Sequence, residues 1–388
     1  MNANTDVNAN TDMSAGRGGG SGADAAPLAA ITGIGPVSRV GIGVAQLAEA
    51  SLPCGGDTGS GIRELDNFDP AEHLGKRGWK FLPPVTRAAL AAVRLALADA
   101  GELPERSPER TGVVIGTNFA VSEIVDRIDR ALLENGIPGI SAVECPNFSV
   151  NVPASQVSIA HRMKAFNVTL SNLLTAGYEA LLVGGRSLRA GRADAVLAGA
   201  IEGRPPAALH TVAGTSVDAA GACLLHLETP QAARERGARV YGWLTGGARR
   251  VLASDAGLAR GTLVSALDSL GDVPPASVHL CLPVGEAEVA ALRAEEDARR
   301  WADGCGAGVT VTRGAPQATA TSVLALARHL VRESSAAPAG TAVAAGTAVA
   351  AGTAAVPHGP GEDDAVFGVL GPQGHLVLLR VATDGGAA

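Results

Sequence analysis

Short apolar runs of strand length alternate with longer segments of helical periodicity, and this alternation limits what the chain can fold into. Gly112–Gly116 (GVVIG) and Ala195–Ala200 (AVLAGA) are typical of strands buried on both faces. Thr86–Ala100 places alanine and leucine at helical spacing and is followed by the helix-ending Gly101. Val121–Leu133 has apolar residues in the i, i+3, i+4, i+7 pattern of an amphipathic helix. The sequence therefore predicts an α/β protein with buried sheets.

Further segments continue the alternation. Strands are expected at Ala29–Gly33, Ala222–Glu228, Val278–Leu282 and Leu376–Val381, and helices at Ala176–Ala190, Gln231–Arg236 and Ala318–Val331. Hydrophobic residues make up 46% of the chain but aromatic residues only 3%, so the core must be built from alanine, valine and leucine. A length of 388 residues suits two domains or one large duplicated domain.

Two segments do not fit this pattern. Residues 1–26 are rich in Asn, Asp, Gly and Ser and have no apolar stretch of the kind found in secretory signals, which predicts a disordered leader. Residues 336–364 contain the hexad AGTAVA twice, followed by a degenerate copy. This composition predicts a low-complexity insert in a surface loop that carries no chemistry.

Charge and cysteine usage exclude several classes of function. The chain has 31 basic and 38 acidic residues, a net charge of −7, which argues against a nucleic-acid partner. Its apolar runs are far shorter than the roughly 20 residues that a membrane span needs, so we expect no membrane association and a cytoplasmic location. The five cysteines form no CxxC pair, so we expect reduced thiols, no metal site and no cofactor.

The segment Thr169–Gly203 (TLSNLLTAGYEALLVGGRSLRAGRADAVLAGAIEG) resembles the nucleophile region of β-ketoacyl synthases. Four other segments follow in that family's order, and the resemblance spans Pro27 to Val381. These segments are Ile31–Gly35, Leu74–Gly101, Gly112–Thr117 and Asp218–Gly246. The resemblance implies a thiolase fold, in which duplicated halves form an αβαβα five-layer sandwich within an intimate dimer. We expect the halves to cover residues 27–215 and 216–388.

By this resemblance, family members join acyl groups held on acyl carrier protein to a malonyl unit with loss of carbon dioxide. Such chemistry needs a cysteine thiolate at a helix N-terminus and two histidines that stabilise the enolate and its oxyanion. Leu174 occupies the cysteine position, and an aliphatic side chain can neither ionise nor form a thioester. The two histidine segments correspond to Leu282–Gly285 and Arg313–Ala318, and neither contains histidine. We therefore predict no catalytic residues and no condensing activity from this chain alone.

The glycine-rich turn of the family is reduced to Ala365–Gly371, and its backbone turn is expected to persist at Phe367–Gly368. No other residue makes a convincing nucleophile or base, because none has a partner at a readable spacing. We interpret these residues as ordinary core, strand or loop residues: Ser171, Cys145, Cys223, Cys281, His161, His210 and His279.

Among relatives of this kind, chain-length factors also lack the cysteine, although they usually carry glutamine where this chain has leucine. The resemblance implies a heterodimer with an active ketosynthase in type II polyketide or fatty-acyl chain biosynthesis. In the family, the segment equivalent to Asn118–Glu134 floors the partner's acyl tunnel, with Phe119, Ile124 and Ile128 as the candidate lining residues. The alternative is that these residues only pack the dimer core.

Two other functions stay open on the sequence alone. One is a divergent acyltransferase that uses a repurposed cleft, although no suitable thiol or imidazole is apparent near Leu174. The other is a docking scaffold for acyl carrier protein, with Lys76, Arg77 and Arg87 presented to its acidic surface. The same basic residues could also form an ordinary solvated face.

Overall fold

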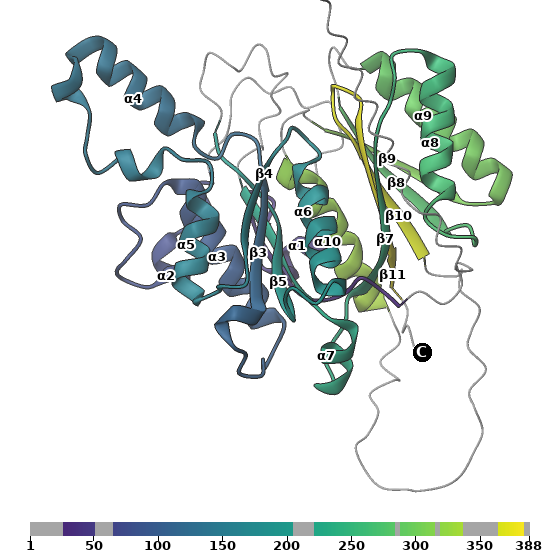
Figure 1. Ribbon diagram of the computed structural model, residues 1–388, viewed down its shortest axis with the longest axis horizontal. Helices are drawn as coiled ribbons and strands as arrows, with labels where there is room; N and C mark the ends of the chain where they lie inside the picture. Colours follow the sequence, from purple (N-terminus) through teal and green to yellow (C-terminus); the bar gives the residue numbers. More distant parts are fainter. Residues whose placement is uncertain are drawn as a thin grey trace, which may run out of the picture.

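A mixed sheet of eleven strands organises the protein, as the computed structural model in Figure 1 shows. The structure describes residues 26–50, 65–204, 221–283, 288–314, 319–336 and 364–383. The first run of strands comprises β1 (Ala29–Ser38), β3 (Thr111–Thr117), β4 (Asn167–Ser171), β5 (Ala195–Glu202) and β6 (Gly221–Glu228). Their order is β4-β3-β5-β6-β1, and the two-residue β2 (Gly41–Ile42) pairs with β1. Strands β4, β3 and β5 are parallel, whereas β6 is antiparallel to both of its neighbours.

The second run repeats the strand order of the first. It comprises β7 (Gly242–Val251), β8 (Ser277–Pro283), β9 (Gly308–Gly314), β10 (Asp364–Leu370) and β11 (His375–Ala382). Read from its outer edge the order is β9-β8-β10-β11-β7, so each run follows the order third, second, fourth, fifth, first. The parallel and antiparallel pairs also correspond. The runs are joined where β1 pairs with β7.

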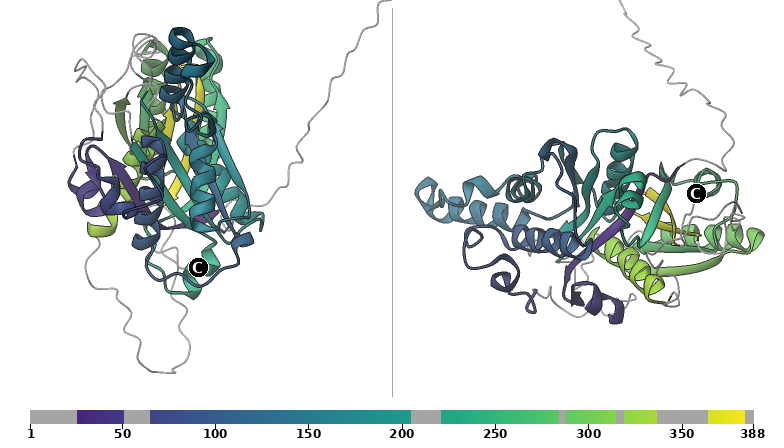
Figure 2. Two further views of the ribbon diagram at one scale, coloured as in Figure 1. Left: turned by 90° about the vertical axis from the view of Figure 1, so that its left-hand side faces the viewer. Right: turned by 90° about the horizontal axis from the view of Figure 1, so that it is seen from below.

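Helices form three layers, outside and between the two runs (Figures 1 and 2). The first outer layer packs on β1, β3 and β6, the central layer contacts both runs through α6, and the second outer layer packs on β7, β8 and β9. These layers contain α3 (Pro84–Asp99) with α5 (Val152–His161), then α6 (Ala176–Arg189) with α10 (Thr319–Ala336), then α8 (Ala256–Asp268) with α9 (Glu288–Cys305). The layers thus run helix, sheet, helix, sheet, helix.

Peripheral elements complete the described chain. They are α1 (Val44–Glu49), α2 (Pro70–Leu74), α4 (Ser122–Asn135), α7 (Pro230–Glu235) and the short 3-10 turns η1 (Pro108–Arg110), η2 (Ile137–Gly139) and η3 (Cys145–Asn147). Within the described part of the chain, no helix combines the length and the apolar character that crossing a membrane requires.

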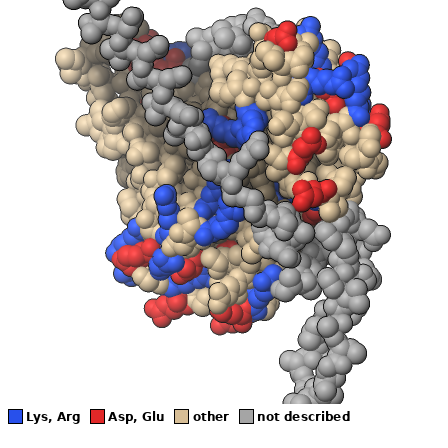
Figure 3. Space-filling model, turned by 45° about the vertical axis from the view of Figure 1, so that its right-hand side comes forward, with Lys and Arg blue, Asp and Glu red and all other residues tan. Residues whose placement is uncertain are grey.

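Small side chains allow the layers to approach closely, which explains a core with so few aromatic residues. A Cβ atom on Gly33 of β1 would lie 2.1 Å from the carbonyl oxygen of Ala96, and one on Gly35 would lie 1.9 Å from that of Ala92. Glycine is therefore required where β1 lies against α3. On the surface, acidic and basic side chains are interspersed (Figure 3), as in the Arg299–Glu295 pair at 2.9 Å on α9.

The expected mixed α/β class is confirmed, and the predicted helices at Thr86–Ala100 and Val121–Leu133 correspond to α3 and α4. The turn expected at Phe367–Gly368 is wrong. Both residues lie inside β10, where Gly368 passes between the side chains of Leu280 and Leu378, and the chain turns later, at residues 371–374.

Most of the two segments expected to lack regular structure lies outside the described residues. Of the leader expected at residues 1–26 the structure describes only Ala26, and of the insert expected at residues 336–364 only Ala336 and Asp364. The boundary expected between residues 215 and 216 also lies outside the described residues.

Candidate functional site

The junction between β4 and α6 contains Leu174, the residue at the expected nucleophile position. β4 ends at Ser171 and α6 begins at Ala176, and the side chain of Leu174 between them is fully buried. It belongs to the central apolar core that α6 and α10 form with both runs of strands. A hydrocarbon side chain therefore fills this position.

A carboxylate lies one helical turn away from Leu174. Glu179 is 6% exposed, and its Oε1 accepts hydrogen bonds from the Thr175 hydroxyl at 2.9 Å and from the Asn172 side-chain amide at 2.8 Å. The guanidinium of Arg249 approaches the same oxygen at 3.6 Å. A carboxylate near the positive end of the helix dipole is favourable, but it opposes a second anion at the same place.

The first turn of α10 crosses this junction. The hydroxyl of Thr319 accepts the backbone N–H of Gly177 at 2.8 Å and reaches the carbonyl oxygen of Leu174 at 3.4 Å. A Cβ atom on Gly177 would lie 2.6 Å from Val323 of α10, so only glycine fits at this crossing. Thr319 therefore couples the N-terminal turns of the two central helices.

The histidine nearest in sequence to the expected histidine loop belongs to a separate aromatic cluster. The ring of His279 on β8 lies 4.7 Å from that of His329 and stacks on Phe367 at 4.9 Å. Its Nε2 is 3.0 Å from the hydroxyl of Ser277. Burial, together with His329, lowers the pKa of His279 to about 4, so this imidazole is neutral at pH 7.

The structure describes two of the other candidates, Ser171 and His161. Ser171 is the exposed last residue of β4. His161 ends α5, where burial and the nearby Arg94 lower its pKa. His210 and the segments at residues 284–287 and 315–318 lie outside the described residues.

The cysteines divide into exposed and core positions. Cys145 is exposed in η3, whereas Cys223 on β6 and Cys281 on β8 are buried. Burial raises the pKa of both core thiols, that of Cys281 to about 12, so both are protonated at neutral pH. Among the described residues, no three Cys, His, Asp or Glu side chains form a group suited to a metal ion.

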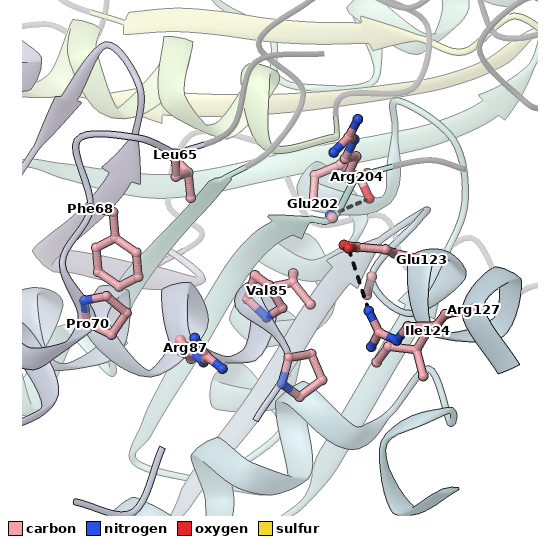
Figure 4. A pocket seen from close by; sticks show the side chains of 14 residues that line it. Leu65, Phe68, Pro70, Val85, Arg87, Glu123, Ile124, Arg127, Glu202 and Arg204 are labelled. Atoms are coloured by element: carbon pink, nitrogen blue, oxygen red, sulfur yellow. Dashed lines mark hydrogen bonds and ion pairs between the residues drawn. The ribbon is translucent and has the colours of Figure 1, made fainter. Parts of the chain in front are cut away.

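A cavity of about 250 Å³ opens at the next strand end, beside α4 (Figure 4). One wall comes from the segment that leads through α2 into α3, the opposite wall from the start of α4, and the floor from the end of β5. The lining residues include Leu65, Phe68, Val85, Ile124 and Glu202. The walls are mainly apolar, as expected of a site for an apolar ligand.

The three residues expected to line a tunnel are separated by the structure. Ile124 is 3% exposed and lines the cavity. Phe119 precedes α4 and is held through its backbone, and neither Phe119 nor Ile128 lines the cavity. Both are partly exposed.

Glu202 is the buried acidic residue of this cavity. It is the last residue of β5, it is 1% exposed, and it accepts the backbone N–H of Phe119 at 2.6 Å, of Asn118 at 3.2 Å and of Gly203 at 3.2 Å. Burial raises the pKa of Glu202 to about 8, against these N–H groups, which lower it.

The helix α4 projects from the body as an arm (Figure 1), and only Ile124 among its residues is buried. The arm is tied by an ion pair of 2.6 Å between Arg127 and Glu144. Large apolar side chains are exposed on the arm and the segment after it, with Leu133 and Ile137 each 78% exposed. The others are Val125, Leu132, Val143, Phe148 and Val150. Such an apolar patch is typical of a protein–protein contact.

The basic residues expected to serve docking behave differently from one another. Lys76 and Arg77 are exposed just after α2. Arg87, in contrast, donates to the carbonyl oxygen of Leu82 at 2.7 Å and lies over the ring of Trp79. The guanidinium of Arg87 thus holds the loop before α3 together.

The sequence interpretation missed Glu179, Glu202 and Thr319. Glu202 had a visible signal, because it is the one charged residue of an otherwise apolar strand, AVLAGAIE. Its partners lie 83 and 84 residues earlier, which no local pattern reveals.

A family model described as "Beta-ketoacyl synthase, N-terminal domain" matches residues 32–242. Among curated proteins, the 3-oxoacyl-(acyl-carrier-protein) synthase 2 of Vibrio cholerae is 28% identical over 189 residues, which are 44% of this chain and 45% of the relative. The enzyme of the same name from Rhizobium meliloti is 27% identical over 194 residues, 44% of this chain and 46% of the relative. The chain thus spans about half the length of the curated relatives it matches.

Solved structures show the same fold over most of the chain. A type II polyketide synthase acyl-carrier protein in complex with its ketosynthase bound to the hexaketide gives a TM-score of 0.71 at 19% identity, covering 92% of this chain and 99% of that one. The ishigamide ketosynthase/chain length factor gives 0.68 at 21% identity with the same coverage. At these identities the likeness establishes the ketosynthase-like fold alone.

Proposed function

We propose that this chain, which belongs to the beta-ketoacyl synthase family, is a ketosynthase-like subunit that does not condense acyl chains by itself. It acts as a chain-length factor: it pairs with an active ketosynthase in type II polyketide or fatty-acyl chain biosynthesis and shapes the acyl cavity. The observation that carries the proposal is the fully buried Leu174 at the N-terminal end of α6.

The chemistry of the α6 junction supports the loss of condensation. A thiolate nucleophile draws its low pKa from a helix N-terminus or a nearby cation. At this junction the side chain is a hydrocarbon, and the buried carboxylate of Glu179 already accepts the two side-chain donors of the turn. Cys223 and Cys281 lie in the core as protonated thiols, so neither replaces the missing nucleophile.

Two features support a partner subunit. The arm at α4 exposes an apolar face that the described chain does not cover. Strand β4 forms one edge of the sheet, and an open edge is a template for pairing with another strand. An obligate interface of this kind commonly buries more than about 2,000 Å² and is rich in apolar side chains.

The cavity beside α4 supports a role in setting chain length. Its walls are mainly apolar, and Ile124 takes part in them from the helix that also carries the exposed arm. A partner that covers the arm would close the open side of the cavity. Among the three expected lining residues, Ile124 is the one we assign to the cavity.

We also propose that the two runs of strands are the duplicated halves of a thiolase fold. The identical strand order and the corresponding parallel pairs support this origin. For carrier-protein docking, the exposed Lys76 and Arg77 supply positive charge, and one structural neighbour is a ketosynthase in complex with its acyl-carrier protein.

Co-expression with the ketosynthase encoded nearest to this chain tests the proposal. We expect the two proteins to co-purify as a heterodimer and to form product together, while neither forms it alone. Product formation by this chain alone would overturn the loss of condensation. Failure to pair with the ketosynthase would overturn the chain-length role.

A further inference from the structure

The carboxylate of Glu202 holds together segments that are distant in the sequence. Asn118 and Phe119, which donate to it, connect β3 to α4, and Gly203 follows β5. The backbone N–H of Thr319, the first residue of α10, also donates to it. One buried side chain therefore contacts the beginnings of α4 and α10 and the end of its own strand.

Thr319 extends this network to the α6 junction. Its backbone donates to Glu202, while its hydroxyl accepts from Gly177 and reaches the carbonyl oxygen of Leu174. A continuous set of hydrogen bonds thus runs from the cavity beside α4 to the position where the family has its nucleophile. Thr319 is fully buried, so water does not compete for its contacts.

The energetic reason for a carboxylate at this place is the concentration of N–H donors. Both oxygens of a carboxyl group can accept hydrogen bonds, so this side chain serves more N–H donors than an amide does. The N-terminus of the 18-residue α10 adds the positive end of a helix dipole. A side chain with only one acceptor oxygen would leave part of these donors unsatisfied in the interior.

The same residue forms part of the cavity. Glu202 lies in the floor, and Ile124 lies in the adjacent wall (Figure 4). Ala120, which also lines the cavity, comes directly after Asn118 and Phe119, whose backbone N–H groups donate to Glu202. Any movement of residues 118–119 would therefore move the wall that Ile124 contributes.

We propose that Glu202 is a positioning residue: its carboxylate fixes the start of α4 against the first turns of α10 and α6, and thereby sets the shape of the cavity beside α4. The consequence for an acyl chain rests on the proposed function. The positioning itself does not, and it can be measured on the isolated chain.

Amide hydrogen exchange on the full-length chain tests the positioning. In Glu202→Gln, the shape is kept but one acceptor oxygen becomes an NH₂ group, so we expect the amides of Asn118 and Phe119 to exchange about tenfold faster or more. Glu202→Asp keeps both carboxyl oxygens on a shorter side chain, and we expect an intermediate rate. If the Gln variant does not fold, the Asp variant alone decides.

The matched control is Glu228→Gln. Glu228 is fully buried and ends β6, at the opposite end of the β5–β6 pair, where it binds Arg106 and Arg236. We expect this variant to leave the exchange of residues 118 and 119 at the wild-type rate. Wild-type rates in the folded Glu202 variants, or the same acceleration in Glu228→Gln, would show that Glu202 positions nothing.

Product analysis with the co-expressed ketosynthase links the positioning to function. We expect the heterodimer of the Glu202→Gln variant with the ketosynthase to release products of a different chain-length distribution from wild type. In the heterodimer of Glu202→Asp, the distribution should be closer to wild type. An unchanged distribution despite faster exchange would overturn the link to cavity shape. If even the wild-type pair makes no product, the proposed function fails, while the exchange experiment still decides the positioning.

Discussion

Two strand-to-helix junctions of the first run lie at the same edge of the sheet, because β3 and β4 are parallel neighbours. The junction from β4 to α6 is closed by the buried side chain of Leu174. The junction from β3 to α4 opens onto a cavity and leads into an arm with an exposed apolar face. Ligands of parallel α/β sheets bind at the carboxyl ends of strands, so both junctions occupy the place expected of a site.

The two junctions also use a buried carboxylate in different ways. Glu179 accepts side-chain donors from its own junction, Asn172 and Thr175. Glu202 accepts backbone donors from three separate segments. The first carboxylate lies near the expected nucleophile position at Leu174, and the second holds the segment that leads into the wall of a cavity. Under the proposed function, the junction at α6 no longer supports condensation, whereas the junction at α4 still forms part of an acyl cavity.

The largest effect concerns the closed junction. We expect Leu174→Cys to give no acyl-enzyme and no condensation, because burial keeps a thiol protonated, as it does for Cys281, whose pKa is raised to about 12. Without a base and an oxyanion donor the rate falls by several orders of magnitude. Intact-protein mass spectrometry after incubation with an acyl thioester measures the acylation, with the partner ketosynthase as positive control. If Leu174→Cys were acylated and turned over at a rate near that of the partner ketosynthase, the closed junction would not differ in chemistry from an active site.

The next effect concerns the arm. Leu133 is 78% exposed on α4, and we expect Leu133→Glu to weaken pairing with the ketosynthase by about 100-fold, because a charge must then be buried in an apolar interface. Leu258→Glu is the matched control, since Leu258 is 66% exposed on α8 in the opposite outer layer. Analytical gel filtration of the mixed proteins measures the pairing. If both variants weaken the pairing equally, the arm is not part of the interface.

The open junction could be predicted from the sequence only in part. The periodicity of Val121–Leu133 located α4 within two residues at each end, because an amphipathic helix shows its pattern locally. The cavity could not be predicted, because its walls come from three segments far apart in the chain. For the same reason Ile124 could not be separated from Phe119 and Ile128 as the lining residue.

The closed junction was more accessible to sequence reasoning, because the residues around Leu174 are continuous in the chain and the resemblance assigns Leu174 to the nucleophile position. Contacts across the central layer, such as that between Gly177 and Thr319, could not be predicted. The turn misplaced at Phe367–Gly368 has a related cause. Glycine marks both turns and sites of close packing, and only the neighbouring strands reveal that Gly368 serves the second purpose.

A smaller effect concerns the pH dependence of stability at the open junction. Burial raises the pKa of Glu202 to about 8 in the folded chain, so its contribution to stability is fully present below the unfolded pKa near 4.5 and is lost as the pH rises through 8. We expect the free energy of unfolding of Glu202→Gln, taken relative to that of the wild type, to increase by at least about 1 kcal/mol between pH 5 and pH 8. Arg87 of α3, Glu123 and Arg127 of α4, and Arg204 line the same cavity and are unchanged in the variant, so the difference isolates Glu202. Urea unfolding at both pH values measures it, and a constant difference would contradict the raised pKa.

The smallest effect concerns the fine shape of the cavity. Ile124→Ala should lengthen the dominant product of the heterodimer by about one extension, because the wall recedes, and Ile124→Phe should shorten it, because the cavity of about 250 Å³ has little room for a larger ring. Val125→Ala is the control, since Val125 is the next residue on α4 but is 47% exposed and does not line the cavity. Mass spectrometry of the products measures their length. If the Ile124 and Val125 variants give products of the same length, α4 serves only the interface. The open junction would then have no role in setting chain length.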